Sequence, residues 1–203
     1  MTLRHLNLLL LRTLRQIDVE AAPVDGDYPT GLWWYAGHLD RDRTPRKVLN
    51  SEVEWTRRMA ELLPGNKHSL RASEQRFPGS RQRCDVVIDI GKPKPFWIEV
   101  KGAWRAYFDP PKPNSAYIKH LHAAAADVDK LQTLTQRDAC GIAFVLVGFD
   151  QPKLPITDKH MEIILAKITH PGWTSDCTAW DVVGRVNFRM RLWVWSRWIS
   201  EEE

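Results

Sequence analysis

The sequence predicts one α/β domain built on a central mixed β-sheet of about five strands flanked by α-helices. Apolar residues recur at helical spacing in several segments, and short runs between them alternate apolar and polar residues as strands do. Residues 142–149 are continuously apolar, which is typical of a buried strand. The chain has 203 residues, 43% of them hydrophobic, which is enough for one well-packed domain and few for two. We therefore treat residues 1–203 as a single domain.

Two helices are expected before the first strand. Residues 2–17 place apolar side chains at the spacing of one helix face, namely Leu3, Leu6, Leu10, Leu14 and Ile17. Residues 45–63 predict a second helix, because Pro45 suits a first turn and Pro64 followed by Gly65 ends a helix. The segment between the two helices is rich in turn residues and is expected to be mostly loop.

Three extended runs follow, at roughly 69–77, 84–90 and 96–103. The last two are separated by residues 91–95, with the sequence Gly-Lys-Pro-Lys-Pro. A five-residue break that contains glycine and proline suits a hairpin connection. These two strands are therefore expected to be antiparallel neighbours.

The rest of the chain alternates between helix and strand. After a proline-rich loop at 104–115, a helix that ends before Gly141 is predicted by one apolar face, made of Ile118, Leu121, Ala125, Val128 and Leu131. The buried strand at 142–149 follows, and then a short helix at about 158–169. The Trp-rich tail from 180 to 198 is expected to add at least one strand.

Composition narrows the classes of protein. A net charge of +4 and a pI near 9.0 favour a polyanionic partner without selecting nucleic acid by themselves. The three cysteines, Cys84, Cys140 and Cys177, are far apart and odd in number, which fits neither a disulfide framework nor a CxxC zinc site. The sequence has no nucleophile elbow and no glycine-rich phosphate loop, which disfavours the corresponding hydrolases and P-loop ATPases.

The sequence further predicts a cytoplasmic protein with reduced thiols. Its N-terminal apolar run, residues 6–11, is too short to span a bilayer, and the polar segment after it lacks a small-residue cleavage site. We therefore expect neither secretion nor a membrane anchor.

Candidate catalytic residues lie in the expected hairpin, where alternate residues of each strand face opposite sides. In the first strand the apolar side would consist of Cys84, Val86, Ile88 and Ile90. The other side of that strand would carry Asp85 and Asp89. In the partner strand Glu99 and Lys101 would lie on this same mixed side, next to Trp97.

The pairing of the two strands decides how close the charged groups come. A hairpin centred on Pro93 places Asp85 across from Lys101 and puts Asp85 and Glu99 on a diagonal about 7 Å apart. A two-residue shift in pairing would place Asp85 directly opposite Glu99. A one-residue shift would turn the two acids to different faces.

Two carboxylates beside an ammonium group suit phosphodiester hydrolysis. Mg²⁺ prefers hard oxygen ligands and keeps several waters, so Asp85, Glu99 and the carbonyl of Val100 are candidate ligands. Such an ion neutralises charge on the phosphate and lowers the pKa of a bound water. Lys101 would orient that water and stabilise the transition state. The ordinary structural interpretation is an ion pair on a half-exposed hairpin.

The segments 83–88 (Arg-Cys-Asp-Val-Val-Ile) and 96–102 (Phe-Trp-Ile-Glu-Val-Lys-Gly) resemble the Asp…Glu-x-Lys core of the PD-(D/E)xK, or restriction-endonuclease-like, nucleases. Cys84 stands where the name of the superfamily has proline. The resemblance implies a restriction-endonuclease-like core at about 45–149, in the order helix, three strands, helix and strand. The N-terminal helix and the C-terminal Trp-rich segment would be extensions of this core.

The resemblance also implies further site residues. An upstream helix in these nucleases often contributes an acid, and Glu52 is our candidate for binding a second ion or orienting the water of the first. The polar sequence 127–131 resembles a helix that often borders the site, which makes Lys130 a candidate phosphate contact. Further candidate nucleic-acid contacts are Arg81, Arg83 and Arg105. Basic side chains of this kind are also common on a solvated surface with no ligand.

By this resemblance the chain would be a Mg²⁺-dependent endonuclease acting on DNA, with Mn²⁺ as a substitute, in bacterial or phage DNA processing or defence. RNA stays an alternative substrate, and a homodimer or a partner protein would suit the cutting of both strands. Two other functions stay open. One is a non-catalytic nucleic-acid-binding or assembly module that retains the nuclease fold, and the other is a nuclease subunit that a partner activates.

Overall fold

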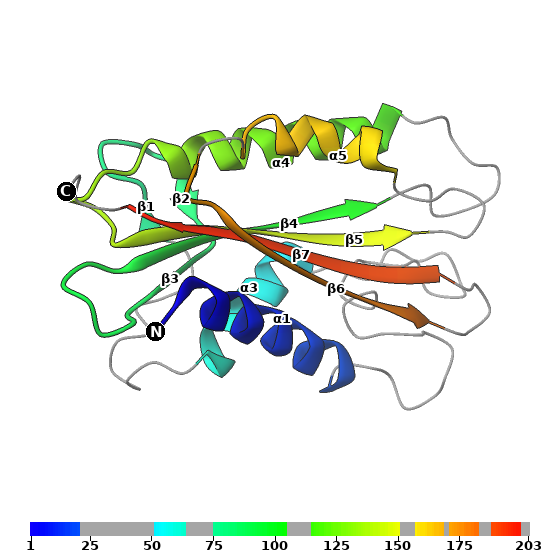
Figure 1. Cartoon of the computed structure of the whole chain (residues 1–203), viewed down its shortest axis with the longest axis horizontal. Coiled ribbons are helices and arrows are strands. Elements are labelled where there is room, and N and C mark those ends of the chain that lie inside the picture. The colour runs from blue at the N-terminus through cyan, green and yellow to red at the C-terminus, as the bar shows by residue number, and fades with distance from the viewer. Residues whose placement is uncertain are drawn as a thin grey trace.

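A five-stranded mixed sheet between two layers of helices organises the part of the chain that the computed structural model describes (Figure 1). The described residues are 1–20, 51–63, 75–104, 115–150, 157–168, 171–182 and 188–199. Within them the helices are α1 (Leu3–Glu20), α3 (Ser51–Leu62), α4 (Ser115–Gln132) and α5 (Asp158–Leu165). This arrangement confirms the expected α/β class.

The strands of the central sheet follow the order β3-β4-β5-β7-β6. Their bounds are β3 (Val86–Ile88), β4 (Phe96–Trp104), β5 (Gly141–Asp150), β6 (Thr174–Val182) and β7 (Phe188–Trp198). β4 and β5 are parallel, with α4 between them in the chain, whereas the other neighbouring pairs are antiparallel. A separate two-stranded ribbon consists of β1 (Gln75–Arg76) and β2 (Arg83–Cys84).

α1 and α3 cover one face of the central sheet (Figure 1). Leu10 and Leu14 of α1 and Trp55 of α3 are fully buried against this face. On the sheet side the same apolar layer includes Ile98 of β4 and Val145 of β5. Each large apolar side chain removed from water in this way contributes about 1.5–3 kcal/mol. This layer therefore anchors the strands that carry the candidate site.

α4 and α5 cover the opposite face of the sheet (Figure 1). Leu121 and Val128 of α4 pack in one layer with Trp97 of β4. Trp195 of β7 belongs to the same layer and stacks on Phe144 of β5, with ring centroids 6.1 Å apart. The Trp-rich tail thus contributes to the core of the fold, as its strand pattern predicts.

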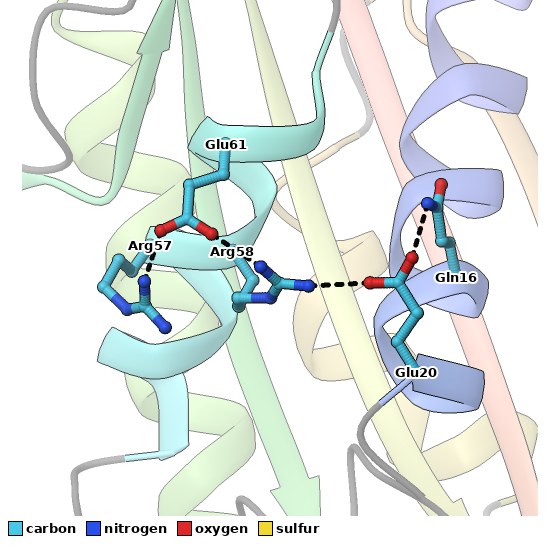
Figure 2. Close-up of polar contacts among 5 residues, drawn as sticks. All are labelled: Gln16, Glu20, Arg57, Arg58 and Glu61. Atoms are coloured by element: carbon cyan, nitrogen blue, oxygen red, sulfur yellow. Dashed lines mark hydrogen bonds and ion pairs between the residues drawn. The ribbon is translucent and has the colours of Figure 1, made fainter.

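Polar side chains join α1 to α3 where both helices meet solvent (Figure 2). The Arg58 guanidinium contacts Glu20 of α1 at 2.6 Å and Glu61 of its own helix at 2.7 Å. Gln16 donates to Glu20 at 2.7 Å, and Arg57 also pairs with Glu61. The ion-paired side chains are 28–50% exposed, so each pair contributes at most about 1 kcal/mol. The apolar layer therefore provides most of the stabilisation between the two helices.

Most elements predicted from the sequence are present among the described residues. The N-terminal helix, the helix after the proline-rich loop, the apolar strand β5 and the short helix α5 are confirmed. The tail supplies β7 and the end of β6, in agreement with the prediction of at least one strand. The predicted start of the second helix, residues 45–50, and the predicted start of the first strand, residues 69–74, lie outside the described residues. None of the described helices has the length and apolar character needed to cross a membrane.

The register of the β3–β4 hairpin corrects the sequence prediction by two residues. The observed pairs are Val86↔Ile98, Val87↔Trp97 and Ile88↔Phe96. The pairing that would place Asp85 across from Lys101 is therefore wrong. Continuing the observed ladder by one residue leads Asp85 to Glu99 instead.

The shift originates in the turn between the two strands. Gly91 adopts a φ of +77°, a conformation that costs glycine little, and it donates its N–H to the Asp89 carboxylate at 2.8 Å. This local bond makes the chain turn early, so the hairpin is centred on Lys92 rather than on Pro93. The sequence-based prediction gave too much importance to the prolines and too little to the Asp-x-Gly segment.

Cys84 also corrects the prediction of a single apolar face. It packs with Val87 and Trp97 on the α4 side of the sheet, whereas Val86 and Ile88 belong to the layer beneath α1 and α3. The chain bends between β2 and β3, which interrupts the strand alternation at this point.

Candidate active site

β4 presents Glu99 and Lys101 toward α4. Strand alternation places both on the side of Trp97, which packs in the layer between the sheet and α4. Lys101 follows this direction, because its Nζ lies 3.6 Å from Oδ2 of Asp127 in α4. The two charged residues therefore share one face of β4, as the alternation pattern predicts, and α4 covers that face.

Asp85 lies at the bend between β2 and β3 and meets β4. Its Oδ2 accepts a hydrogen bond from the Val100 N–H at 2.8 Å. The Asp85 carboxyl group therefore lies near that of Glu99, the residue before Val100, and its charge helps to raise the pKa of Glu99. The structure thus brings together the two acids that the sequence analysis singled out.

The carbonyl of Val100 faces the same edge of β4. In a strand the N–H and C=O of one residue point to the same side, and the Val100 N–H points to Asp85. The carbonyl two residues earlier, that of Ile98, shares this direction and accepts a hydrogen bond from Cys84 Sγ at 3.2 Å. Burial, followed by the charges of nearby acids, raises the pKa of the Cys84 thiol, so the thiol stays protonated and acts as the donor.

Glu99 lies in an unfavourable environment for a charged group. It is 3% exposed, and its Oε1 has no hydrogen-bond partner among the described residues. Burial, followed by the charge and hydrogen bond of Asp85, raises the pKa of Glu99 from about 4.5 to about 10. The charge of Asp127 acts in the same direction, and that of Lys130 opposes it. Glu99 therefore stays protonated near neutral pH beside the Asp85 carboxylate.

α4 adds a second pair of charged side chains to this site. Asp127, which is 8% exposed, pairs with Lys130 one turn later in α4 and with Lys101 of β4. Burial tends to lower the pKa of Lys130, but its hydrogen bond to Asp127 and the charge of Glu99 raise it overall. Lys130 therefore remains an ammonium group beside the acids, at the place where a phosphate contact is predicted.

Asp127 is the residue of this site that the sequence reasoning missed. It lies next to Val128 on the buried side of α4, where an ionised carboxylate needs a partner. Its position three residues before Lys130 allows a pair on one helix face. A carboxylate at such a position is the signal that could have identified it.

The remaining predicted site residues are only partly described. Glu52 lies in α3, which packs on the sheet face opposite to α4, but its side chain lies outside the described residues, so its role stays a prediction. Arg105 also lies outside the described residues. Arg81 and Arg83 are exposed beside and within β2, as a nucleic-acid contact requires.

The donor set at this site is chemically suited to a divalent cation. Asp85 and Glu99 offer hard oxygens, and Glu99 Oε1 is a buried acceptor without a hydrogen-bond partner in the described part of the chain. Across the described residues, however, no three or more His, Cys, Asp and Glu side chains are grouped so that they could hold a metal ion. A cation here would therefore depend on two carboxylates, the Val100 carbonyl and water.

Comparisons with protein-family models, with curated proteins and with solved structures find no match for this chain. The resemblance to the PD-(D/E)xK nucleases therefore stays a prediction that depends on the residues of the hairpin.

Proposed function

We propose that this chain is a metal-dependent nuclease with a restriction-endonuclease-like core that hydrolyses phosphodiester bonds in DNA. The proposal rests on one observation: the Asp85 carboxylate accepts the Val100 N–H, which places it against β4 between Glu99 and Lys101, and these two residues share one face of β4. The element order α3, β1, β2, β3, β4, α4 and β5, with β4 parallel to β5, is compatible with that core.

The oxygen ligands would come from both strands of the hairpin. Asp85, Glu99 and the carbonyl of Val100 would hold Mg²⁺ or Mn²⁺, and Glu52 stays a candidate for a further ligand. The bound ion would supply positive charge against the scissile phosphate and lower the pKa of a water molecule. Asp85 is already held in place by the Val100 N–H, so this carboxylate needs little rearrangement.

Lys101 supplies a fixed positive charge beside the acids. Its side chain is 21% exposed, so a substrate can reach the ammonium group while water screens it only in part. We assign it to orienting the attacking water and to stabilising the negative charge that develops on the phosphate. Lys130 adds a second ammonium group that offsets the charge of the DNA backbone.

The test is cleavage of supercoiled plasmid, linear DNA and RNA in Mg²⁺, Mn²⁺ or EDTA, with wild type beside Lys101→Ala. We expect metal-dependent cleavage that the substitution slows by about 10²-fold or more. The matched control is Lys167→Ala, which breaks an ion pair with Asp129 on the solvent side of α4. Equal cleavage by wild type and Lys101→Ala would contradict the site. The products distinguish nicking, double-strand cutting and end degradation.

A non-catalytic nucleic-acid-binding or assembly module is the second candidate. It is favoured by the observation that the described residues contain no group of three metal-binding side chains. Binding of Mn²⁺ that disappears in Asp85→Ala supports the nuclease, because a scaffold has no use for that carboxylate. A nuclease subunit that needs a partner would bind the metal alone and cleave only after the partner is added.

A further inference from the structure

We infer that Asp127 of α4 is a positioning residue that holds the ammonium groups of Lys101 and Lys130 side by side. The site would then meet a substrate phosphate with two cations, one from the sheet and one from the helix above it. This inference rests on the proposed function, and it assigns a task to a residue that the nuclease resemblance leaves without one.

Asp127 contacts the two lysines with different oxygens. Its Oδ2 lies 3.6 Å from Nζ of Lys101, and its Oδ1 is ion-paired with Nζ of Lys130. Two ammonium groups at such short range repel each other, and a carboxylate between them offsets the repulsion. Lysine has a flexible four-carbon stem, so its charge is held in one place only where a partner holds it.

The burial of these groups makes the contacts effective. The side chain of Asp127 is 12% exposed, against 21% for Lys101 and 28% for Lys130. By contrast, the side chains of Asp129 and Lys167 in the neighbouring ion pair are 51% and 43% exposed. Water screens exposed pairs, so the contacts of Asp127 are the stronger constraint on lysine position. α4 thus carries one bridging carboxylate and one surface carboxylate two residues apart.

A purely structural role for Asp127 explains the geometry less well. α4 is already attached to the sheet by apolar side chains, among them Leu121 and Val128, which are fully buried. A carboxylate close to a bound phosphate also repels it, which weakens substrate binding. An acid between two lysines therefore lowers the total positive charge of the site but fixes the positions of both ammonium groups. This arrangement suits a site in which those positions determine the reaction rate.

The experiment compares wild type with Asp127→Asn, Asp127→Glu and the control Asp129→Asn. DNA affinity is measured in EDTA by fluorescence anisotropy, and cleavage under single-turnover conditions with Mg²⁺. Asp127→Asn removes one negative charge, so we expect it to bind DNA at least as tightly as wild type. We expect its cleavage to be about 10- to 100-fold slower. Asp127→Glu should restore part of the rate, and Asp129→Asn should match wild type.

The ¹⁵N resonances of the lysine ammonium groups give a readout that does not depend on activity. Asp127→Asn should broaden or shift the signals of Lys101 and Lys130 and leave that of Lys167 unchanged. Asp129→Asn should do the reverse. Unchanged Lys101 and Lys130 signals in Asp127→Asn overturn the inference.

The outcomes separate this inference from the proposed function. Wild-type protein that neither cleaves nucleic acid nor binds Mn²⁺ overturns the function and the inference together. Active wild type with an equally active Asp127→Asn overturns the inference alone. The inference is also overturned if Asp127→Asn cleaves slowly only near its unfolding temperature and regains the wild-type rate on cooling. That pattern indicates that Asp127 stabilises the fold and does not position the lysines. If Asp127→Asn does not fold, Asp127→Glu tests the inference instead. This variant is expected to fold and to cleave more slowly than wild type. An unchanged cleavage rate overturns the inference.

Discussion

Two clusters of buried polar side chains lie on opposite faces of the sheet. Beneath α1, the fully buried Asn7 donates to the Thr174 carbonyl at 3.2 Å and to Asp176 at 3.0 Å. Its side-chain oxygen accepts a hydrogen bond from Ser196 at 2.6 Å. Beneath α4, Glu99 has one carboxyl oxygen without a partner among the described residues. The first cluster is satisfied by the protein, and the second is not.

This difference separates a polar cluster that serves the fold from one that is a candidate ligand site. Both the amide donor and the oxygen of Asn7 have partners, so the cluster is complete when the chain folds. Asp85 and Glu99 bring like charges together and need a shared proton or a cation. Such an arrangement opposes folding, which makes it a candidate functional site.

Breaking the satisfied cluster should have the largest effect on stability. Asn7→Ala leaves the Ser196 hydroxyl and the Asp176 carboxylate without their partner and opens a small cavity, so we expect a loss of roughly 2–4 kcal/mol. Urea unfolding measures it, with the exposed Arg12→Ala on the same helix as control. A loss no larger than that of the control would contradict the comparison.

Neutralising Glu99 in the unsatisfied cluster should increase the free energy of unfolding, whereas Asn7→Ala should decrease it. The pKa of Glu99 is raised to about 10 in the folded chain, so between pH 4.5 and 10 the folded chain holds a proton that the unfolded chain releases. Stability therefore falls as pH rises through this window. Glu99→Gln removes the penalty and should stabilise the metal-free protein by roughly 1–3 kcal/mol near pH 8, and by less near pH 5.

Thermal unfolding in EDTA from pH 5 to 9 measures this gain, with the exposed Glu162→Gln as control. The same Glu99→Gln variant should be inactive in the cleavage assay. A stability difference between wild type and Glu99→Gln that does not change with pH would show that the pKa of Glu99 is not raised in the folded chain.

Binding of a cation should stabilise the protein through the Asp85–Glu99 cluster and not through the Asn7 cluster, by a smaller free energy than the substitutions above. Mn²⁺ at tenfold its dissociation constant stabilises a protein with one site by about 1.4 kcal/mol. We expect this rise in unfolding temperature for wild type and none for Asp85→Ala. Asn7→Ala should keep the full shift, because its cluster lies on the other face of the sheet. Equal shifts in wild type and Asp85→Ala would place the metal elsewhere.

Polar contacts in solvent should have the smallest effect. Arg58→Ala removes the contacts to Glu20 and Glu61 shown in Figure 2, and we expect a loss of at most about 1 kcal/mol in urea unfolding. The expected loss should shrink further in 1 M salt, which screens exposed charges. A loss as large as that of Asn7→Ala would mean that the α1–α3 contact depends on this exposed network.

Local sequence patterns predict the strand that carries the candidate site, but only some of the residues that contact it. Strand alternation alone places Glu99 and Lys101 on one side of β4. The register depends on the turn, and the Asp89–Gly91 hydrogen bond shifts it by two residues from the prediction. A shift of two keeps every side chain on its face, which explains why Asp85 still meets Glu99.

Strand alternation does not identify Asp127, whose only sequence signal is its place on the buried side of α4, three residues before Lys130. Its contact with Lys101 joins a strand to the helix that crosses over it, and such contacts between distant parts of the chain leave no periodic signal. The face of Cys84 was also beyond alternation, because the chain bends between β2 and β3. In both cases tertiary geometry decides what local periodicity cannot.

All charged groups of the described site belong to one stretch of the chain, residues 85–130, which contains β3, β4 and all but the last two residues of α4. β6 and β7 lie beyond β5 in the sheet, away from β4. Recombination outside this stretch would therefore leave these charged groups together, whereas the candidate ligand Glu52 of α3 would be exchanged. The smallest unit for such an exchange is the segment from β3 to β5, because β5 pairs with β4 along its whole length.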